Sequence, residues 1–318
     1  MRAIIYGLTA SFFFAFTFIL NRSMELEGGF WAWSACLRFF VMLPMLLPLL
    51  LLMPGKNSGL ARLRAALCHL RDNWLAYLIW STVGFGLFYA PLSLAGAYGP
   101  GWLVAATWQI TIIAGPLLAP LISRPVAPAH GKSAKSAWSG LFGSMRWSLL
   151  ILLGVAMMQL EYAIDISAGE ALFCVLPILL AAFMYPLGNR KMMEVCKDEV
   201  DTFQRVFNMV VASLPFWIII AAYGGAVYGA PPAGQIAQSA LVALFSGVIA
   251  TLLFFSATNL VKNNPDRLAA VEATQSGEVL FALAGEIVLL SAPLPELFSL
   301  LGIALVIIGM VLHSLRRA

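Results

Sequence analysis

The chain has 318 residues, of which 61% are hydrophobic and only 11% are charged. Soluble domains carry roughly 25% charged residues, so this composition excludes an ordinary soluble enzyme or binding module. The four cysteines and three histidines are dispersed and form neither a CxxC motif nor a cluster with metal-ligand spacing. We therefore expect no disulfide, no metal site and no bound cofactor.

Apolar segments long enough for membrane-spanning helices, which need about 20 residues, recur along the whole chain. They predict an all-α integral membrane protein with ten transmembrane helices, at 3–20, 33–53, 74–94, 102–122, 147–160, 171–187, 204–223, 236–260, 268–290 and 297–315. The first segment is short enough for a signal peptide. It lacks a small-x-small cleavage site, so we interpret it as a span of the mature protein.

The basic residues predict the orientation, because cytoplasmic loops are enriched in lysine and arginine. With the N-terminus inside, sixteen of the 19 lysines and arginines lie in inner segments, and only Arg22 lies in an outer one. Arg38 and Arg205 lie within spans. This asymmetry predicts a multi-pass protein of the plasma (inner) membrane with both termini cytoplasmic. It also explains the net charge of +4 without nucleic-acid binding.

Matching residues recur in the two halves of the chain at a nearly constant offset. Three pairs carry the match, at offsets of 168, 167 and 166: Asn21-Arg22 with Asn189-Arg190, Arg38 with Arg205, and Gln109 with Gln275. We predict that residues 1–160 and 161–318 are two five-helix repeats. Because each half has an odd number of spans, the repeats must be inverted. Inverted repeats are typical of secondary transporters, whose substrate site lies at the repeat interface.

Short motifs near the C-terminus resemble a known repeat. Gly285-Glu286, Gly302-Ile303 and Gly309-Met310 resemble the end of the EamA-type repeat of ten-helix drug/metabolite transporters, and Arg38-Phe39 also fits that pattern. The stretches 16–22 and 98–102 look most like the multidrug-efflux members. The resemblance covers essentially the whole chain and implies an exporter of small molecules.

The chain departs from this pattern at two places. Its fourth span ends Ile122-Ser123-Arg124 without the expected Gly-Glu, so the two halves have diverged. Its first span has no acidic residue, whereas the four-helix small multidrug-resistance relatives rely on one there. The coupling mechanism of those relatives is therefore not carried over to this chain.

The ninth predicted span holds three glutamates, and an ionisable group in a bilayer costs about 2.5–3.5 kcal/mol on insertion scales. At 100° per residue, Glu272, Gln275, Glu278 and Glu286 lie on one side of this helix, which should face the bundle. Glu278 lies nearest the centre, and no arginine is expected at its depth. We expect Glu278 to couple transport to protons or to bind a cationic substrate.

The roles of the other intramembrane polar residues are less sharply defined by the sequence. Glu272 either contributes to substrate binding or pairs with an arginine, for which Arg205 and Arg267 are candidates. Glu286 is expected to serve packing. Arg38 and Arg205 should lie near opposite membrane surfaces, as structural anchors or gate elements.

Deep aromatic residues complete the predicted site. Tyr89, Trp108 and Tyr185 lie deeper than the tryptophans at span ends, and such rings either pack or bind a cationic or aromatic substrate. We place the site between the halves, lined by the first, third, fourth, sixth, eighth and ninth spans. The candidate substrate-binding residues are Tyr89, Trp108, Gln109, Tyr185, Glu272 and Gln275.

These features predict a secondary transporter, rather than an enzyme, that exports drug-like, cationic or aromatic compounds or metabolites by alternating access. The chain has no Walker A motif, so we expect a proton or exchange mechanism instead of ATP drive. The expected partners are a small-molecule substrate, the lipid bilayer and a coupling proton. Two alternatives remain open: an integral-membrane enzyme acting on lipid, and a metabolite exchanger or facilitator without proton coupling.

Overall fold

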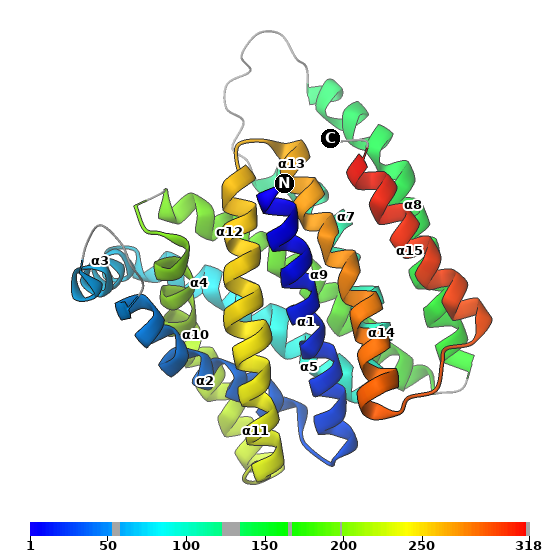
Figure 1. The fold of residues 1–318 in the computed structure, drawn as a ribbon, viewed down its shortest axis with the longest axis horizontal. Helices are drawn as coiled ribbons and strands as arrows, with labels where there is room; N and C mark the ends of the chain where they lie inside the picture. The colour runs from blue at the N-terminus through cyan, green and yellow to red at the C-terminus, as the bar shows by residue number, and fades with distance from the viewer. Residues whose placement is uncertain (53–57, 123–133, 165–166, 198, 316–318) are drawn as a thin grey trace.

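The computed structural model describes residues 1–52, 58–122, 134–164, 167–197 and 199–315. All regular structure in these ranges is helical (Figure 1). The helices are α1 (Arg2–Leu26), α2 (Trp31–Leu52), α3 (Gly59–Asp72), α4 (Trp74–Ser81), α5 (Leu87–Tyr98), α6 (Gly101–Trp108), α7 (Thr111–Ile122), α8 (Ala134–Ile164), α9 (Ala168–Cys196), α10 (Thr202–Val227), α11 (Ala233–Val242), α12 (Thr251–Val261), α13 (Pro265–Glu272), α14 (Gly277–Leu290) and α15 (Leu297–Leu315).

Seven helical stretches within the described ranges are long and apolar enough to cross a membrane. They are Arg2–Leu26, Trp31–Leu52, Trp74–Tyr98, Ala168–Cys196, Thr202–Val227, Ala233–Val261 and Ala270–Leu290. Three shorter apolar helices, at 101–115, 149–164 and 297–312, lie where the sequence predicts the fourth, fifth and tenth spans. The all-helical fold is thus confirmed, and the count of ten spans stays a prediction. Of the basic residues behind the predicted orientation, Lys56, Arg124, Lys132, Arg316 and Arg317 lie outside the described residues.

The outer surface of the bundle is apolar. Leu8 of α1, Ile219 of α10 and Val288 of α14 are 50%, 67% and 76% exposed. Large aliphatic side chains with this exposure are unfavourable in water but suit a hydrocarbon environment. The surface therefore agrees with the apolar composition in indicating a membrane protein.

The predicted fourth and ninth spans are interrupted, whereas the sequence predicted continuous helices. Between α6 and α7, the N–H groups of Gln109 and Ile110 bond to carbonyls only three residues earlier. The side-chain amide of Gln109 donates to the Ala105 carbonyl at 2.9 Å, which replaces the backbone bond that the break removes. Between α13 and α14 lies a 3₁₀ turn, η3 (Ala273–Ser276), where the Thr274 hydroxyl bonds to the Val271 carbonyl at 2.6 Å.

Two further irregularities lie in the third and eighth predicted spans. The π-helical segment η1 (Thr82–Gly86) joins α4 to α5, and η2 (Ala243–Ala250) joins α11 to α12. At η1 the backbone touches that of α9, because a Cβ added to Gly188 would lie 2.2 Å from the Cα of Gly84. A side chain at either glycine would force these two helices apart.

The helices pack in a pattern that looks the same after the two halves are exchanged. Helix α1 packs against α11, η2 and α12 and against α14, whereas α9 packs against α4, η1 and α5 and against α6 and α7. The other extensive contacts join α2 to α10 and α8 to α15, each a pair with one member from each half. The start of α1 and the end of α15 lie at the same end of the bundle (Figure 1).

Helix α3 lies outside this pattern and docks on α10 through a buried polar cluster, here called the α3–α10 cluster (His69, Tyr77, Cys196 and Asn208). Tyr77 is fully buried, and its hydroxyl lies 2.9 Å from His69 Nδ1, 3.3 Å from Asn208 Nδ2 and 3.4 Å from Cys196 Sγ. Asn208 also donates to the Ala66 carbonyl at 2.8 Å. Each member of the cluster therefore has at least one polar partner.

Candidate functional site

A cavity lies where helices from both halves meet in the interior of the bundle. The open space within this central cavity is about 20 Å³, which is room for about one water molecule, and its walls come from α1, α2, α5, α6, α9, η2, η3 and α14. The six spans expected to line the site all contribute, and α2 is an addition. The polar or charged residues of the wall include Arg38, Tyr185, Gln275 and Glu278.

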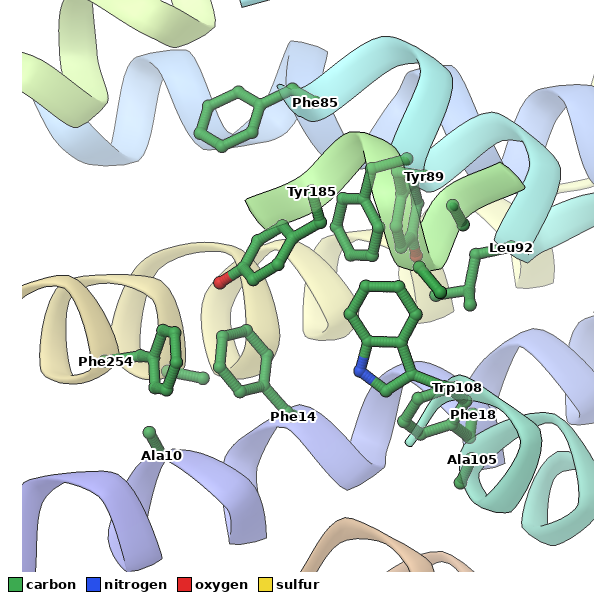
Figure 2. Packing of buried hydrophobic residues seen from close by; sticks show 14 of the residues in the cluster. Ala10, Phe14, Phe18, Phe85, Tyr89, Leu92, Ala105, Trp108, Tyr185 and Phe254 are labelled. Carbon is green, nitrogen blue, oxygen red and sulfur yellow. The ribbon is translucent and has the colours of Figure 1, made fainter. Parts of the chain in front are cut away.

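One side of the central cavity is aromatic. Trp108 of α6, Tyr185 of α9 and Phe88 of α5 pack on one another, with ring centroids 5.0 Å apart for Phe88–Trp108, 4.7 Å for Phe88–Tyr185 and 5.6 Å for Trp108–Tyr185. Figure 2 shows Trp108 and Tyr185 gathered with Phe14 of α1 around a common space. This wall offers apolar surface and ring faces to a ligand.

The polar groups of the central cavity lack partners within the described part of the chain. Nε and Nη1 of Arg38, the hydroxyl of Tyr185 and Nε2 of Gln275 are buried without a hydrogen bond. No described hydrogen bond or ion pair includes Glu278, although this residue is only 1% exposed. Buried polar groups in proteins are nearly always satisfied, so several exceptions around one cavity make it the candidate binding site.

Arg38 lies deeper than the sequence indicated. It is 3% exposed, its guanidinium carbon lies 4.0 Å above the centre of the Tyr89 ring, and it lines the same cavity as Glu278. The prediction that no arginine reaches the depth of Glu278 is therefore wrong. Arg38 reaches the cavity because α2 packs against α5 and η2, an arrangement that its position along the helix does not reveal.

Tyr89 does not line the central cavity directly, since it is fully buried beneath Arg38. Its hydroxyl donates to Asn21 Oδ1 at 3.4 Å. In the other half, the guanidinium of Arg205 lies 4.8 Å above the centre of the Phe255 ring. Tyr89 and Phe255 are 166 residues apart, the same offset that separates Gln109 from Gln275. Phe255 is thus the sequence counterpart of Tyr89, and this offset could have predicted the contact between Arg205 and Phe255.

A second cavity, with about 30 Å³ of open space, adjoins the first, and Trp108, Tyr185 and Gln275 line both. It also contacts Arg190 and Glu272, so we call it the Arg190 cavity. Arg190 Nη2 lies 3.4 Å from Glu272 Oε1, and Arg190 Nη1 donates to the Gly115 carbonyl at 2.7 Å. Glu272 thus pairs with an arginine that sequence reasoning did not single out as its partner.

The remaining candidates lie away from both cavities. Gln109 is fully buried at the break between α6 and α7, where it bonds to the backbone. Glu286 accepts hydrogen bonds from the N–H groups of Gly101 at 2.7 Å and Trp102 at 3.1 Å. It thereby caps the N-terminus of α6, a position that favours a carboxylate.

At the end of the bundle opposite the Arg190 cavity lies a larger pocket of about 590 Å³. It includes Arg22, Trp102, Glu161 and Glu286 in its wall. Within the described residues, no group of three or more histidine, cysteine, aspartate or glutamate side chains is arranged to hold a metal.

Comparison with known proteins agrees with this geometry. The family model "EmrE: Putative multidrug resistance efflux transporter" matches residues 1–318. The chain is 52% identical over 314 residues to "Uncharacterized protein YjlA" of Bacillus subtilis (strain 168), covering 99% of this chain and 94% of that protein. It is 45% identical over 278 residues to "Uncharacterized 42.1 kDa protein in intracellular alkaline protease 3'region" of Shouchella clausii, covering 87% of this chain and 70% of that protein. The chain is therefore a multi-pass membrane protein that belongs to the EmrE-like efflux transporter family of the drug/metabolite transporter superfamily.

Proposed function

We propose that the protein is a secondary transporter that exports small organic molecules by alternating access, with the central cavity as its substrate site. The observation that carries this proposal is the cavity itself. It lies where both halves meet, has aromatic walls, and holds charged and polar atoms that lack partners within the described residues. Transporters of this architecture bind substrate at such an interface and expose it to each side in turn.

The proposal includes ten spans arranged as inverted repeats, residues 1–160 and 161–318. Three features support the symmetry: the exchangeable packing pattern, the paired irregularities in the third and eighth and in the fourth and ninth spans, and the two arginine–ring contacts. We place both termini in the cytoplasm, because the basic residues favour it and the chain begins and ends at one end of the bundle.

Gating at the cytoplasmic end is assigned to Arg190 and Glu272. This ion pair borders the Arg190 cavity, and its members are only 21% and 22% exposed. Its arginine also holds the Gly115 carbonyl, so the pair links α9 to α7 and α13. Separation of the pair would open a route from the cytoplasm to the shared wall of the two cavities.

Coupling is assigned to Glu278. A carboxylate inside a membrane protein that faces a cavity and lacks a partner is suited to exchange protons. Proton release would leave an anion that attracts a positively charged group of the substrate, and protonation would favour release of that group. Competition for one carboxylate is sufficient for proton–substrate antiport. A metabolite exchanger would use the same cavity without this competition.

The proposal is tested by flux in proteoliposomes. Purified protein is reconstituted with phenethylamine, ethidium or L-phenylalanine as the labelled probe, and a pH gradient is imposed. We expect protein-dependent accumulation of at least one probe, accompanied by proton movement. Probe exchange without proton movement would show an exchanger, and flux equal to that of protein-free liposomes for all probes would contradict the transporter assignment.

Orientation is tested separately by labelling single cysteines from outside intact cells, in a variant without the four native cysteines. Position 229, in the segment after α10, should be labelled, and position 132 should be protected. Efficient labelling at position 132 without labelling at position 229 would reverse the proposed topology.

A further inference from the structure

Two buried side chains of opposite charge face the central cavity without pairing with each other. Arg38 and Glu278 both line it, and neither takes part in an ion pair within the described ranges. Arg38 is 3% and Glu278 is 1% exposed, so water at the protein surface does not solvate them. Arg38 lies over the Tyr89 ring, which supplies no negative charge to pair with it. A buried charge without a counter-charge is destabilising, and two of them at one cavity need a common explanation.

The hydrogen-bond donors and acceptors in the cavity wall restrict the charges that a ligand can carry. Within the described part of the chain, Arg38 offers Nε–H and Nη1–H, and Gln275 offers Nε2–H, without acceptors. No described hydrogen bond includes the Glu278 carboxyl group. While Glu278 is ionised, a simple cation would satisfy it and leave Arg38 unpaired, whereas a simple anion would do the reverse. A ligand with both charges satisfies both residues at once.

The wall beside these groups suits a ligand with an apolar body. The open space within the central cavity is about 20 Å³ in this structure, so the cavity must widen as a ligand enters, and the Phe88, Trp108 and Tyr185 rings form one wall. An aromatic or branched aliphatic group would contact this wall, while its polar groups reach the charged side chains. Tyr185, whose hydroxyl has no partner, adds a neutral hydrogen-bonding group beside them.

We propose that the transported substrate is a zwitterion, a small molecule that carries one ammonium and one carboxylate group on an aromatic or apolar body. Glu278 binds the ammonium group, and Arg38 and Gln275 bind the carboxylate. This inference rests on the proposed function and deepens it, because the sequence suggested cationic or aromatic compounds, and Arg38 adds the requirement for a negative charge. Sites built for a polar group reject analogues that lack it, since their own buried group is then left unpaired.

The test uses equilibrium binding, which does not depend on transport. Three probes share one phenyl group: L-phenylalanine carries both charges, phenethylamine only the positive one, and 3-phenylpropanoate only the negative one. Their affinities for the purified full-length protein in detergent are measured by titration calorimetry. We expect the zwitterion to bind about tenfold or more tighter than either singly charged probe, because each of those leaves one charge unpaired.

Two variants assign the charges. Glu278→Gln should remove the preference for L-phenylalanine over 3-phenylpropanoate, and Arg38→Gln should remove the preference over phenethylamine. Because Arg38→Gln loses the contact with Tyr89 and can impair folding, the wild-type selectivity and Glu278→Gln decide the outcome without it. Equal or tighter binding of either singly charged probe by the wild-type protein would overturn the zwitterion proposal, as would no binding of any probe. Probe flux in proteoliposomes would still stand as evidence for the proposed transporter in the first case.

Discussion

The central cavity and the α3–α10 cluster are both buried and polar, yet they differ in whether their polar side chains have partners. In the α3–α10 cluster, the Tyr77 hydroxyl lies within hydrogen-bonding distance of His69 and Asn208, and Asn208 also bonds to the Ala66 carbonyl. Every side chain of this cluster therefore has a polar partner, although His69 Nε2 and Asn208 Oδ1 form no hydrogen bond. In the central cavity, Arg38 has two nitrogens without partners, and Glu278 has no described hydrogen bond or ion pair.

This difference distinguishes polar groups that stabilise the fold from polar groups that are available to bind a ligand. A hydrogen bond between buried groups contributes about 0.5–1.5 kcal/mol, and a buried group left without one costs about 1–3 kcal/mol. The α3–α10 cluster therefore stabilises the docking of α3, whereas the unpartnered groups of the central cavity weaken the empty protein and favour a ligand. Substitutions in the two regions should accordingly affect different properties.

The largest expected effect on stability is in the α3–α10 cluster. Tyr77→Ala removes a fully buried ring and leaves His69 and Asn208 without a partner, so unfolding should become easier by about 3–5 kcal/mol. Chemical unfolding of the protein in detergent measures this change. The folded fraction should bind ligand with unchanged affinity. A loss of affinity in that fraction would contradict the claim that the α3–α10 cluster serves stability alone.

Removal of an aromatic wall of the central cavity should have the opposite profile. Trp108→Ala is expected to weaken substrate binding about tenfold, equivalent to about 1.4 kcal/mol, without reducing the amount of folded protein. Trp74→Ala is the matched control, because Trp74 is 61% exposed and lies outside the cavity wall. If the Trp108 and Trp74 variants bind and transport alike, Trp108 contributes to helix packing and not to substrate binding.

The gate assignment predicts a change in access. Arg190→Gln removes the ion pair with Glu272 and should raise the rate at which a cysteine placed at position 111, in the wall of the Arg190 cavity, reacts with a thiol reagent from the cytoplasmic side. We expect an increase of severalfold. Lys191→Gln is the control, since Lys191 is the neighbour of Arg190 in the sequence but pairs with Glu194. Identical rates in both variants would exclude Arg190 from gating.

The smallest effect is expected at the edge of the α3–α10 cluster. Arg62 Nη2 lies 2.7 Å from Asp201 Oδ2, and the two side chains are 11% and 46% exposed. An ion pair with one solvated partner contributes about 0–1 kcal/mol, so Arg62→Gln should change the free energy of unfolding by about 1 kcal/mol or less. A loss as large as that of Tyr77→Ala would mean that charge, and not burial, holds α3 in place.

The sequence predicted the helices and part of the site because both depend on local patterns. Long apolar runs define spans, and a 100° periodicity places Gln275 and Glu278 on the face that lines the central cavity. Trp108 and Tyr185 also lie in its wall. The roles assigned to these residues stay predictions.

The rest depends on packing that no local pattern encodes. The partner of Glu272 is Arg190 on another helix, and Arg38 reaches the cavity because α2 packs beside α5 and η2. The break at Gln109 could not be predicted either. No glycine or proline marks it, and its stabilising bond comes from the side chain of Gln109 itself.

The most direct test of the contrast between the two regions is the Glu278→Gln variant, measured for both stability and flux. This change keeps the shape of the side chain and removes a buried charge without a partner, so thermal stability should be equal to or higher than that of the parent. Uphill movement of the transported probe in an imposed pH gradient should be abolished. If the variant transports at the parent rate, or if it loses stability as Tyr77→Ala does, Glu278 is not the coupling group of the central cavity.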